Sequence, residues 1–165
     1  MRVLSGLIIC GFFVLMMGAI SPAAAQGFAV YVDIKPQSCP NPCNVNSKGV
    51  ITVAVLGTTD FDVTQVDPAE VRLEGVAPLR WSFEDVATPA NNGDPYTCTT
   101  EGPDGFMDMT FKFKTQEIVE ALDGDVSDGD MIFLYLTGRL KEEFNGRPFA
   151  GRDWVVIIKK GKSNH

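Results

Sequence analysis

The sequence predicts a single-domain, all-β protein, an antiparallel β-sandwich of about seven strands with an Ig-like arrangement. Three observations predict this fold. Apolar and polar residues alternate with a period of two in most of the segments that have a regular pattern. Turn residues recur roughly every 8 to 15 residues, and no helical pattern is longer than two turns.

The N-terminal half of the predicted sandwich contains four strands. Over residues 28–34 every second residue is apolar, and Pro36 ends the pattern. A run rich in β-branched residues between two glycines predicts a strand over residues 49–56. Shorter apolar runs predict strands over residues 71–74 and 79–83.

The C-terminal half contains the most regular alternation in the chain, over residues 106–114. Its apolar side chains are predicted to face the core: Met107, Met109, Phe111 and Phe113. Two further strands are expected over residues 131–140 and 154–159. Asn145-Gly146 predicts a tight turn between them, because both residues accept positive φ angles.

Two segments predict short helices. Asp67 and Glu70 have the spacing of a capping box around one helical turn. Thr115 is expected to cap a helix over residues 115–122. Between the strands, residues 86–105 contain prolines, glycines and asparagines without apolar periodicity, and they predict a loop that is long for a compact domain.

Residues 1–25 have the pattern of a secretory signal peptide. Arg2 precedes an apolar stretch over residues 7–20, and small residues stand at Ala23 and Ala25, where signal peptidase reads the chain. The apolar stretch is shorter than the roughly 20 residues that a membrane span needs. We therefore expect a secreted protein, periplasmic or extracellular, without a membrane anchor.

The remaining chain is expected to fold as one sandwich domain over residues 26–160, followed by a short disordered tail over residues 161–165. The whole sequence has 14 basic and 21 acidic residues, a net charge of −7, so nucleic acid is a poor partner. The single histidine, His165, is the last residue. This position argues against histidine-dependent catalysis and histidine metal sites.

Three cysteines follow the leader, so at most one intramolecular disulfide can form among them. Cys39 and Cys43 are four residues apart in a proline-containing turn and form the preferred pair. The alternative partner is Cys98, which would tie the long loop to that turn.

Several segments together resemble a β-sandwich module found in secreted and surface proteins of environmental bacteria. They read VDIKPQSCPN (32–41), VAVLGTTDFDVTQVDPAEV (53–71), WSFEDV (81–86), GPDGFMDMTFKFKTQE (102–117), LTG (136–138) and NGRPFAG (145–151). The resemblance covers about residues 32–158. It implies a β-sandwich fold, a secreted setting and a non-catalytic accessory role, and it implies no particular activity.

In such modules the EDV segment continues into a loop rich in Asn, Asp and Gly that looks like a calcium loop, whereas this chain inserts residues 87–102. The acids on both sides of the insertion are candidate calcium ligands, because hard cations prefer oxygen donors. These residues are Glu84, Asp85, Asp104 and Asp108. The alternative is that they are ordinary turn residues.

We therefore expect a secreted, non-catalytic binding or structural module that acts by surface contact and is stabilised by calcium. Its partner would be an extracellular ligand or protein, and self-association is compatible with this expectation. One alternative is a subunit of an extracellular fibre or matrix, assembled by strand addition through residues 26–34. A second is a carboxylate-dependent hydrolase, in which Trp81 and Trp154 would form a platform for sugars.

Overall fold

The computed structural model describes residues 27–90, 96–123 and 126–159. These residues form nine strands, one α-helix and two short 3-10 helices. The strands are β1 (Phe28–Ala29), β2 (Val32–Ile34), β3 (Pro42–Asn44), β4 (Val50–Val55), β5 (Val66–Leu73), β6 (Arg80–Glu84), β7 (Asp108–Lys114), β8 (Met131–Leu140) and β9 (Pro148–Ile158). The helices are α1 (Thr115–Ala121) and the 3-10 turns Val63–Gln65 and Glu142–Phe144.

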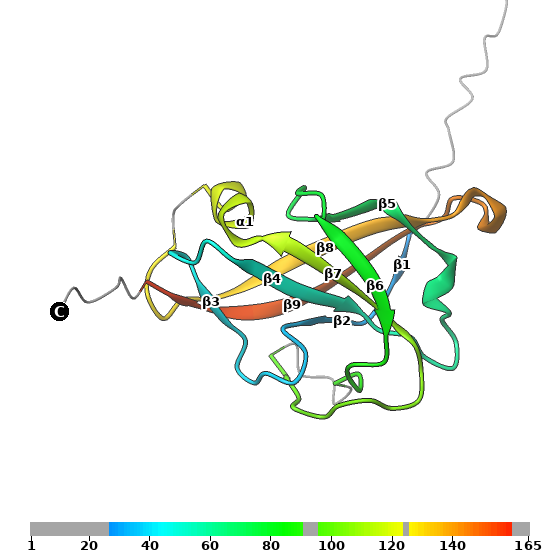
Figure 1. Ribbon diagram of the computed structural model, residues 1–165, viewed down its shortest axis with the longest axis horizontal. Helices are drawn as coiled ribbons and strands as arrows, with labels where there is room; N and C mark the ends of the chain where they lie inside the picture. Colours follow the sequence, from blue (N-terminus) through cyan, green and yellow to red (C-terminus); the bar gives the residue numbers. More distant parts are fainter. Residues whose placement is uncertain (1–26, 91–95, 124–125, 160–165) are drawn as a thin grey trace, which may run out of the picture.

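The strands lie in two sheets that pack face to face (Figure 1). One sheet has the order β1-β9-β8-β5, with β3 also paired to β9, and the other has the order β2-β4-β7-β6. The predicted all-β sandwich with one short helix is confirmed. Most strand pairs are antiparallel, but β1 and β3 each run parallel to β9. The expected leader and tail lie outside the described residues.

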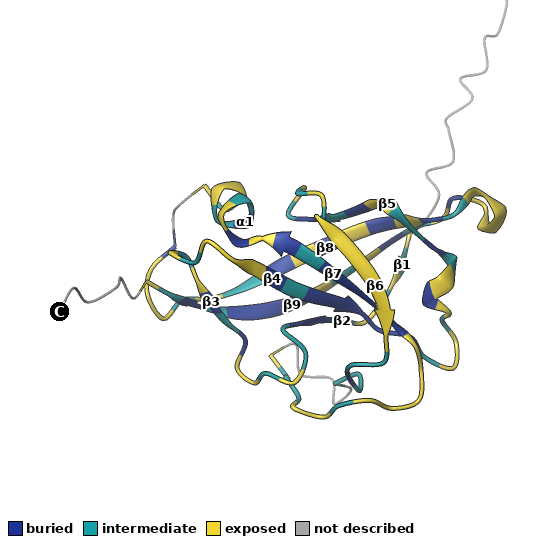
Figure 2. Ribbon diagram, in the orientation of Figure 1, coloured by how far each residue is buried: buried dark blue, intermediate teal, exposed yellow. Residues whose placement is uncertain are grey.

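The core lies between the two sheets, where buried side chains from both sheets meet. Figure 2 marks the buried residues along the strands of both sheets. Phe111 and Phe113 of β7 have no exposed surface, and Leu134 and Leu136 of β8 are equally buried in the opposite sheet. The inward-facing residues of β7 pair across the sheet with those of β4. The regular alternation at 106–114 therefore predicts the strand and its buried face correctly, with the exceptions given below.

The first predicted strand, over residues 28–34, divides into two strands that belong to different sheets. β1 pairs with β9, and β2 pairs with β4. The chain crosses from one sheet to the other beside Gly151, where a Cβ atom would lie 2.6 Å from the carbonyl oxygen of Val30. Glycine at this position permits the close approach of β2 and β9.

Two local predictions are wrong. Asp67 and Glu70 lie in β5 rather than in a helical turn, and a register irregularity in the β5–β8 pairing separates Asp67 from Arg72. The Asp67 carboxylate still accepts the N–H of Ala69, as a cap would, but pairing with β8 overrides the helical signal. Likewise, α1 begins at Thr115, and its N-cap residue is Lys114, which makes no side-chain capping bond.

The start of β7 also differs from the prediction. Met107 precedes the strand and is half exposed, so it does not belong to the core. Asp108, predicted to face solvent, has no exposed surface. The segment between β6 and β7 explains this difference, because it folds back over the outer face of the sheet. There Ala87 packs in a small cluster with Ala54 and Leu56.

The sandwich predicts strongly different sensitivities at neighbouring positions of β7. Phe111→Ala should lower the free energy of unfolding by about 3 to 5 kcal/mol, because it removes a large buried side chain and leaves a cavity. Lys112→Ala should cost about 1 kcal/mol or less, because it removes one half-buried hydrogen bond to Thr52. Urea titrations of both variants measure the difference, and equal losses would show that the inner face is misassigned.

Candidate functional site

The four predicted calcium ligands lie at or near the ends of β6 and β7, and the carboxylates of three of them, Asp85, Asp104 and Asp108, accept backbone N–H groups. Asp108 is buried, and its Oδ1 accepts the N–H of Gly57 at 2.9 Å. Its Oδ2 accepts the N–H groups of Val86 and Ala87 at 2.8 and 3.2 Å. Burial raises the pKa of the Asp108 carboxyl, while these three donors act in the opposite direction. Asp108 therefore fixes the point where the long loop leaves β6.

The other three acids lie around the same loop. The Asp85 carboxylate accepts the N–H groups of Asp104 and Gly105, and Glu84 is exposed and pairs in register with Asp108. Within residues 27–90, 96–123 and 126–159, no group of three or more His, Cys, Asp or Glu side chains is arranged to hold a metal ion. Calcium binding by these acids stays a prediction.

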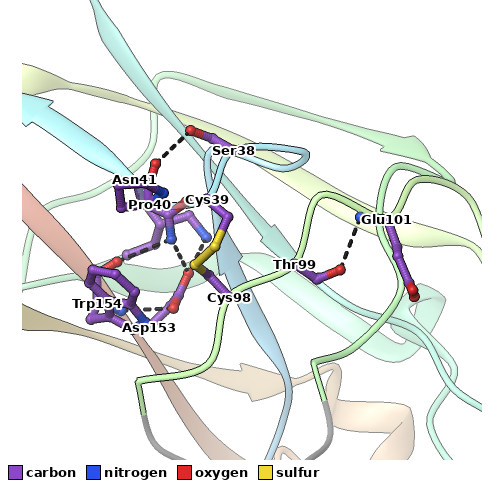
Figure 3. The surroundings of a disulfide bond; sticks show 10 residues. Ser38, Cys39, Pro40, Asn41, Cys98, Thr99, Glu101, Asp153 and Trp154 are labelled. Carbon is purple, nitrogen blue, oxygen red and sulfur yellow. Dashed lines mark hydrogen bonds between the residues drawn. A yellow bond between two sulfur atoms is a disulfide. The ribbon is translucent and has the colours of Figure 1, made fainter.

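The disulfide joins Cys39 to Cys98, with 5.4 Å between their Cα atoms (Figure 3). The preferred pairing of Cys39 with Cys43 is therefore wrong, and the alternative partner is the correct one. Cys43 lies in β3 with its side chain in the core, where burial raises the pKa of its thiol. The alternation that places Cys43 in the core also turns it away from the loop.

A buried polar network lies near this disulfide, where β2 meets β9 (Figure 3). Oδ2 of Asp153 accepts the backbone N–H of Ile34 at 2.8 Å and the side-chain amide of Asn41 at 2.9 Å. Its Oδ1 accepts the N–H of Trp154. Asn41 is completely buried and also donates to the carbonyl of Trp154. Asp153 thus joins the edge of one sheet to a strand of the other.

Asp33 of β2 is the second buried carboxylate of this region and is only 8% exposed. Among the residues that the structure describes, its Oδ2 atom has no hydrogen-bond partner. Burial, and then the negative charges of Asp153 and Asp108, raise the pKa of Asp33 to about 7. Burial also raises the pKa of Asp153, although its three hydrogen bonds oppose that effect. A buried carboxyl oxygen without a hydrogen-bond partner is unusual in a folded protein.

Sequence reasoning missed this network. Asp33 and Asp153 are far apart in the chain, and no local pattern connects them. The one available signal is the charged residue Asp33 within a strand whose other residues are mostly apolar. The period of two assigns Asp33 to the outer face of the sheet. That face is covered by the long loop, which the sequence does not reveal.

A different surface lies at the opposite edge of the same sheet, on β6. All five residues of β6 are exposed. Trp81 and Phe83 are 45% and 41% exposed, and their rings form an edge-to-face pair with centroids 5.3 Å apart. They pair in register with Phe111 and Met109, which point into the core. Trp81 and Phe83 therefore extend the apolar inner face of this sheet to a place that the opposite sheet does not cover.

The β6 surface, defined as Leu79, Trp81 and Phe83, borders a shallow cleft between β5 and β6. Of the described residues that line the cleft, two are cationic, Arg72 and Arg80, and none is acidic. The charge of the cleft is therefore positive, whereas the net charge of the whole chain is −7. The two tryptophans do not form one platform, because Trp154 is only 6% exposed and is packed against Tyr96.

The Cys39–Cys98 bond should contribute strongly to stability. It joins residues 59 positions apart, so in the chain-entropy model its loss lowers the free energy of unfolding by about 4 kcal/mol. We expect Cys98→Ser to show this loss in urea titrations, whereas Cys43→Ala should cost only about 1 kcal/mol. Non-reducing peptide mapping provides the check, and a Cys39–Cys43 peptide would contradict the pairing.

Asp33 should make stability depend on pH. Because its pKa is about 7 in the folded protein and ordinarily 3.8, the folded state holds the proton more tightly. Stability should therefore fall as the pH rises from about 4 to 7. Asp33→Asn should reduce this slope and raise stability at pH 8 by about 1 to 3 kcal/mol. Denaturant titrations between pH 4 and 8 test it, with the exposed Asp60→Asn as control. An unchanged slope in Asp33→Asn would refute the assignment.

Comparison of the chain with protein-family models, with curated proteins and with solved structures finds no match. The resemblance to the secreted bacterial module and the Ig-like arrangement both stay predictions.

Proposed function

We propose that the protein is a secreted, non-catalytic binding module whose β6 surface takes up an extended segment of a partner protein. The observation that carries the proposal is an edge strand whose residues are all exposed and whose inner face carries two aromatic side chains, Trp81 and Phe83. An edge strand has one row of unpaired backbone N–H and C=O groups, which an added strand can bind. Alternate apolar side chains beside that row give such an added strand its specificity.

The charge of the cleft beside the β6 surface favours one kind of partner. Arg72 and Arg80 line the adjacent cleft, and no described residue that lines it is acidic. A segment that carries apolar and acidic side chains would bury its apolar groups on Trp81 and Phe83 and place its carboxylates near the two arginines. Aromatic and arginine side chains are the types that most often dominate the energy of protein interfaces.

The secreted setting rests on the leader pattern and on the disulfide. Disulfides persist in oxidising compartments and are rare in the cytosol. In the parts of the chain that the structure describes, no helix is long and apolar enough to cross a membrane. The leader itself lies outside the described residues, so secretion is part of the proposal.

The alternatives from the sequence lead to different expectations. Residues 28–29 and 32–34, expected to donate a strand to a neighbour, pair within their own chain, so a fibre would have to use β6 as its acceptor edge. For a carboxylate-dependent hydrolase, Asp153 is a poor candidate because both of its oxygens already accept N–H groups. The binding role is therefore the one that we propose, and the hydrolase stays an alternative.

The test is selection of displayed random peptides on the folded protein, followed by affinity measurements on the selected peptides. Selected sequences should combine apolar and acidic residues, and Trp81→Ser should weaken their binding at least tenfold, about 1.4 kcal/mol. Tyr135→Ser is the matched control, since Tyr135 is an aromatic residue of similar exposure on the other sheet. Binding that depends on Tyr135 but not on Trp81 would contradict the proposal.

Sedimentation of the protein alone distinguishes a foreign partner from a second copy. A monomer at all concentrations fits a foreign partner. Concentration-dependent assembly that Trp81→Ser abolishes would instead favour the fibre alternative.

A further inference from the structure

Aromatic side chains lie on the outer face of the sheet β1-β9-β8-β5, away from the core. Along β8 the side chains of Leu134 and Leu136 are buried in the core, so the residues that alternate with them point outward. Two of these outward residues are aromatic, Phe133 and Tyr135. The outer face of an antiparallel sheet usually carries polar residues, so aromatic side chains at these positions need an explanation.

Four residues form a continuous row on this surface, which we call the β8 face: Tyr96 of the long loop, Phe133 and Tyr135 of β8, and Arg152 of β9. The ring centroids of Tyr96 and Phe133 are 5.1 Å apart. The guanidinium carbon of Arg152 lies 4.4 Å from the centroid of Phe133 and 5.9 Å from that of Tyr135. The guanidinium therefore lies between the two rings of β8.

The two ends of the row are accessible to a ligand. Tyr96 and Tyr135 are 48% and 50% exposed, and Arg152 is exposed as well. Phe133, which contacts both Tyr96 and Arg152, is partly buried. A ligand that lies along the row would thus meet two tyrosine side chains with a cation between them.

The charge of Arg152 is held in place but has no anionic partner. Its guanidinium donates to the hydroxyl of Tyr135 at 3.3 Å, and the other donors of its five N–H groups are available to a ligand. Among the residues that the structure describes, the one ion pair joins Lys114 to Glu117. The carboxylate of Glu74, an acid beside Tyr135, accepts the backbone N–H of Tyr135. The β8 face therefore presents a positioned cation to an anionic group.

The spacing of the groups indicates which ligand fits. Because the guanidinium lies within 5.9 Å of both β8 ring centroids, the ligand has to present an apolar face and an anionic group within one ring-sized unit. The pyranose ring of a uronic acid does so, since its C–H groups form an apolar face and its carboxylate is bonded to the ring. An aspartate or glutamate side chain of a peptide has the carboxylate without such a face.

We propose that the β8 face binds an acidic polysaccharide, with pyranose rings of uronic acid units packed on Tyr135 and Tyr96 and a carboxylate paired with Arg152. The planar guanidinium matches a carboxylate through two parallel hydrogen bonds. Burying the C–H groups of the sugar against aromatic rings is favourable. The row of side chains suits a linear polymer. The β8 face lies on the other sheet from the β6 surface, so this inference does not rest on the proposed peptide site.

The test is a calorimetric titration of the protein with a hexasaccharide of galacturonic acid at neutral pH and physiological salt. Binding should be saturable. The methyl ester of the same hexasaccharide, which keeps the rings and loses the charge, should bind at least tenfold more weakly. Arg152→Gln should lose at least tenfold in affinity for the acid, and Arg152→Lys should recover only part of this loss, because an ammonium group has no planar fork.

The aromatic contact is tested separately. Tyr135→Ser should weaken binding at least tenfold, whereas Tyr135→Phe, which keeps the ring, should bind within about threefold of the native protein. The matched controls lie on β6, where Trp81→Ser and Arg80→Gln should leave the affinity unchanged. Melting temperatures of all variants are compared first. The comparison of acid and methyl ester on the native protein needs no variant.

Three results would overturn the proposal. The first is the absence of saturable binding of the hexasaccharide, and the second is equal binding of its methyl ester. The third is equal binding of polyglutamate, which would indicate that any acidic chain is attracted to Arg152, an acidic protein included. Because the peptide site is tested through Trp81 and the polysaccharide site through Tyr135 and Arg152, failure of one proposal is distinguishable from failure of the other.

Discussion

The carboxylate of Asp153 is the interaction on which the arrangement of the two sheets depends. It lies on β9 in one sheet and accepts the backbone N–H of Ile34 at the edge of the other. Burying a charge is costly unless several donors compensate it, and here Asn41 and the N–H of Trp154 supply the remaining bonds. Replacing Asp153 or Asn41 by an apolar residue would leave buried polar groups without hydrogen-bond partners, near the point where the chain crosses from one sheet to the other.

The long loop gives this network its shielding from water. The bond between Cys39 and Cys98 holds the loop against the turn that follows β2. Tyr96, also in the loop, packs against the Trp154 and Phe133 rings of the opposite sheet. The loop is therefore attached to both sheets, and it covers the place where β2 and β9 meet. This covering also explains why an aspartate at an outward-facing position of β2 is buried, and hence why its proton is bound so tightly.

The amino-acid pattern predicts those parts of the fold that depend on local periodicity. Residues 131–140 form the strand that their alternation predicts, and the core face of 106–114 is correct from Met109 onward. The pattern gives a wrong prediction where pairing with another strand determines the local structure. Asp67 is an example, because it keeps its capping hydrogen bond but lies in strand β5. The pattern also fails for the carboxylate network, because the contact of Asp33 with the loop depends on a disulfide partner that the spacing of cysteines does not specify.

The two edge strands of the sheet β2-β4-β7-β6 differ in whether another part of the protein lies against their outward-facing backbone groups. At β2 the edge lies beside β9, and the Asp153 carboxylate of β9 accepts the outward-facing N–H of Ile34. At β6 the edge is open and carries Trp81 and Phe83, whose alternation would predict a buried strand. Natural sheets usually protect open edges with charge or cover them. β6 carries the charges of Arg80 and Glu84 at its ends, but the rings of Trp81 and Phe83 between them are exposed. Burying these rings against a partner would be favourable, and this is the physical basis of the binding role that we propose.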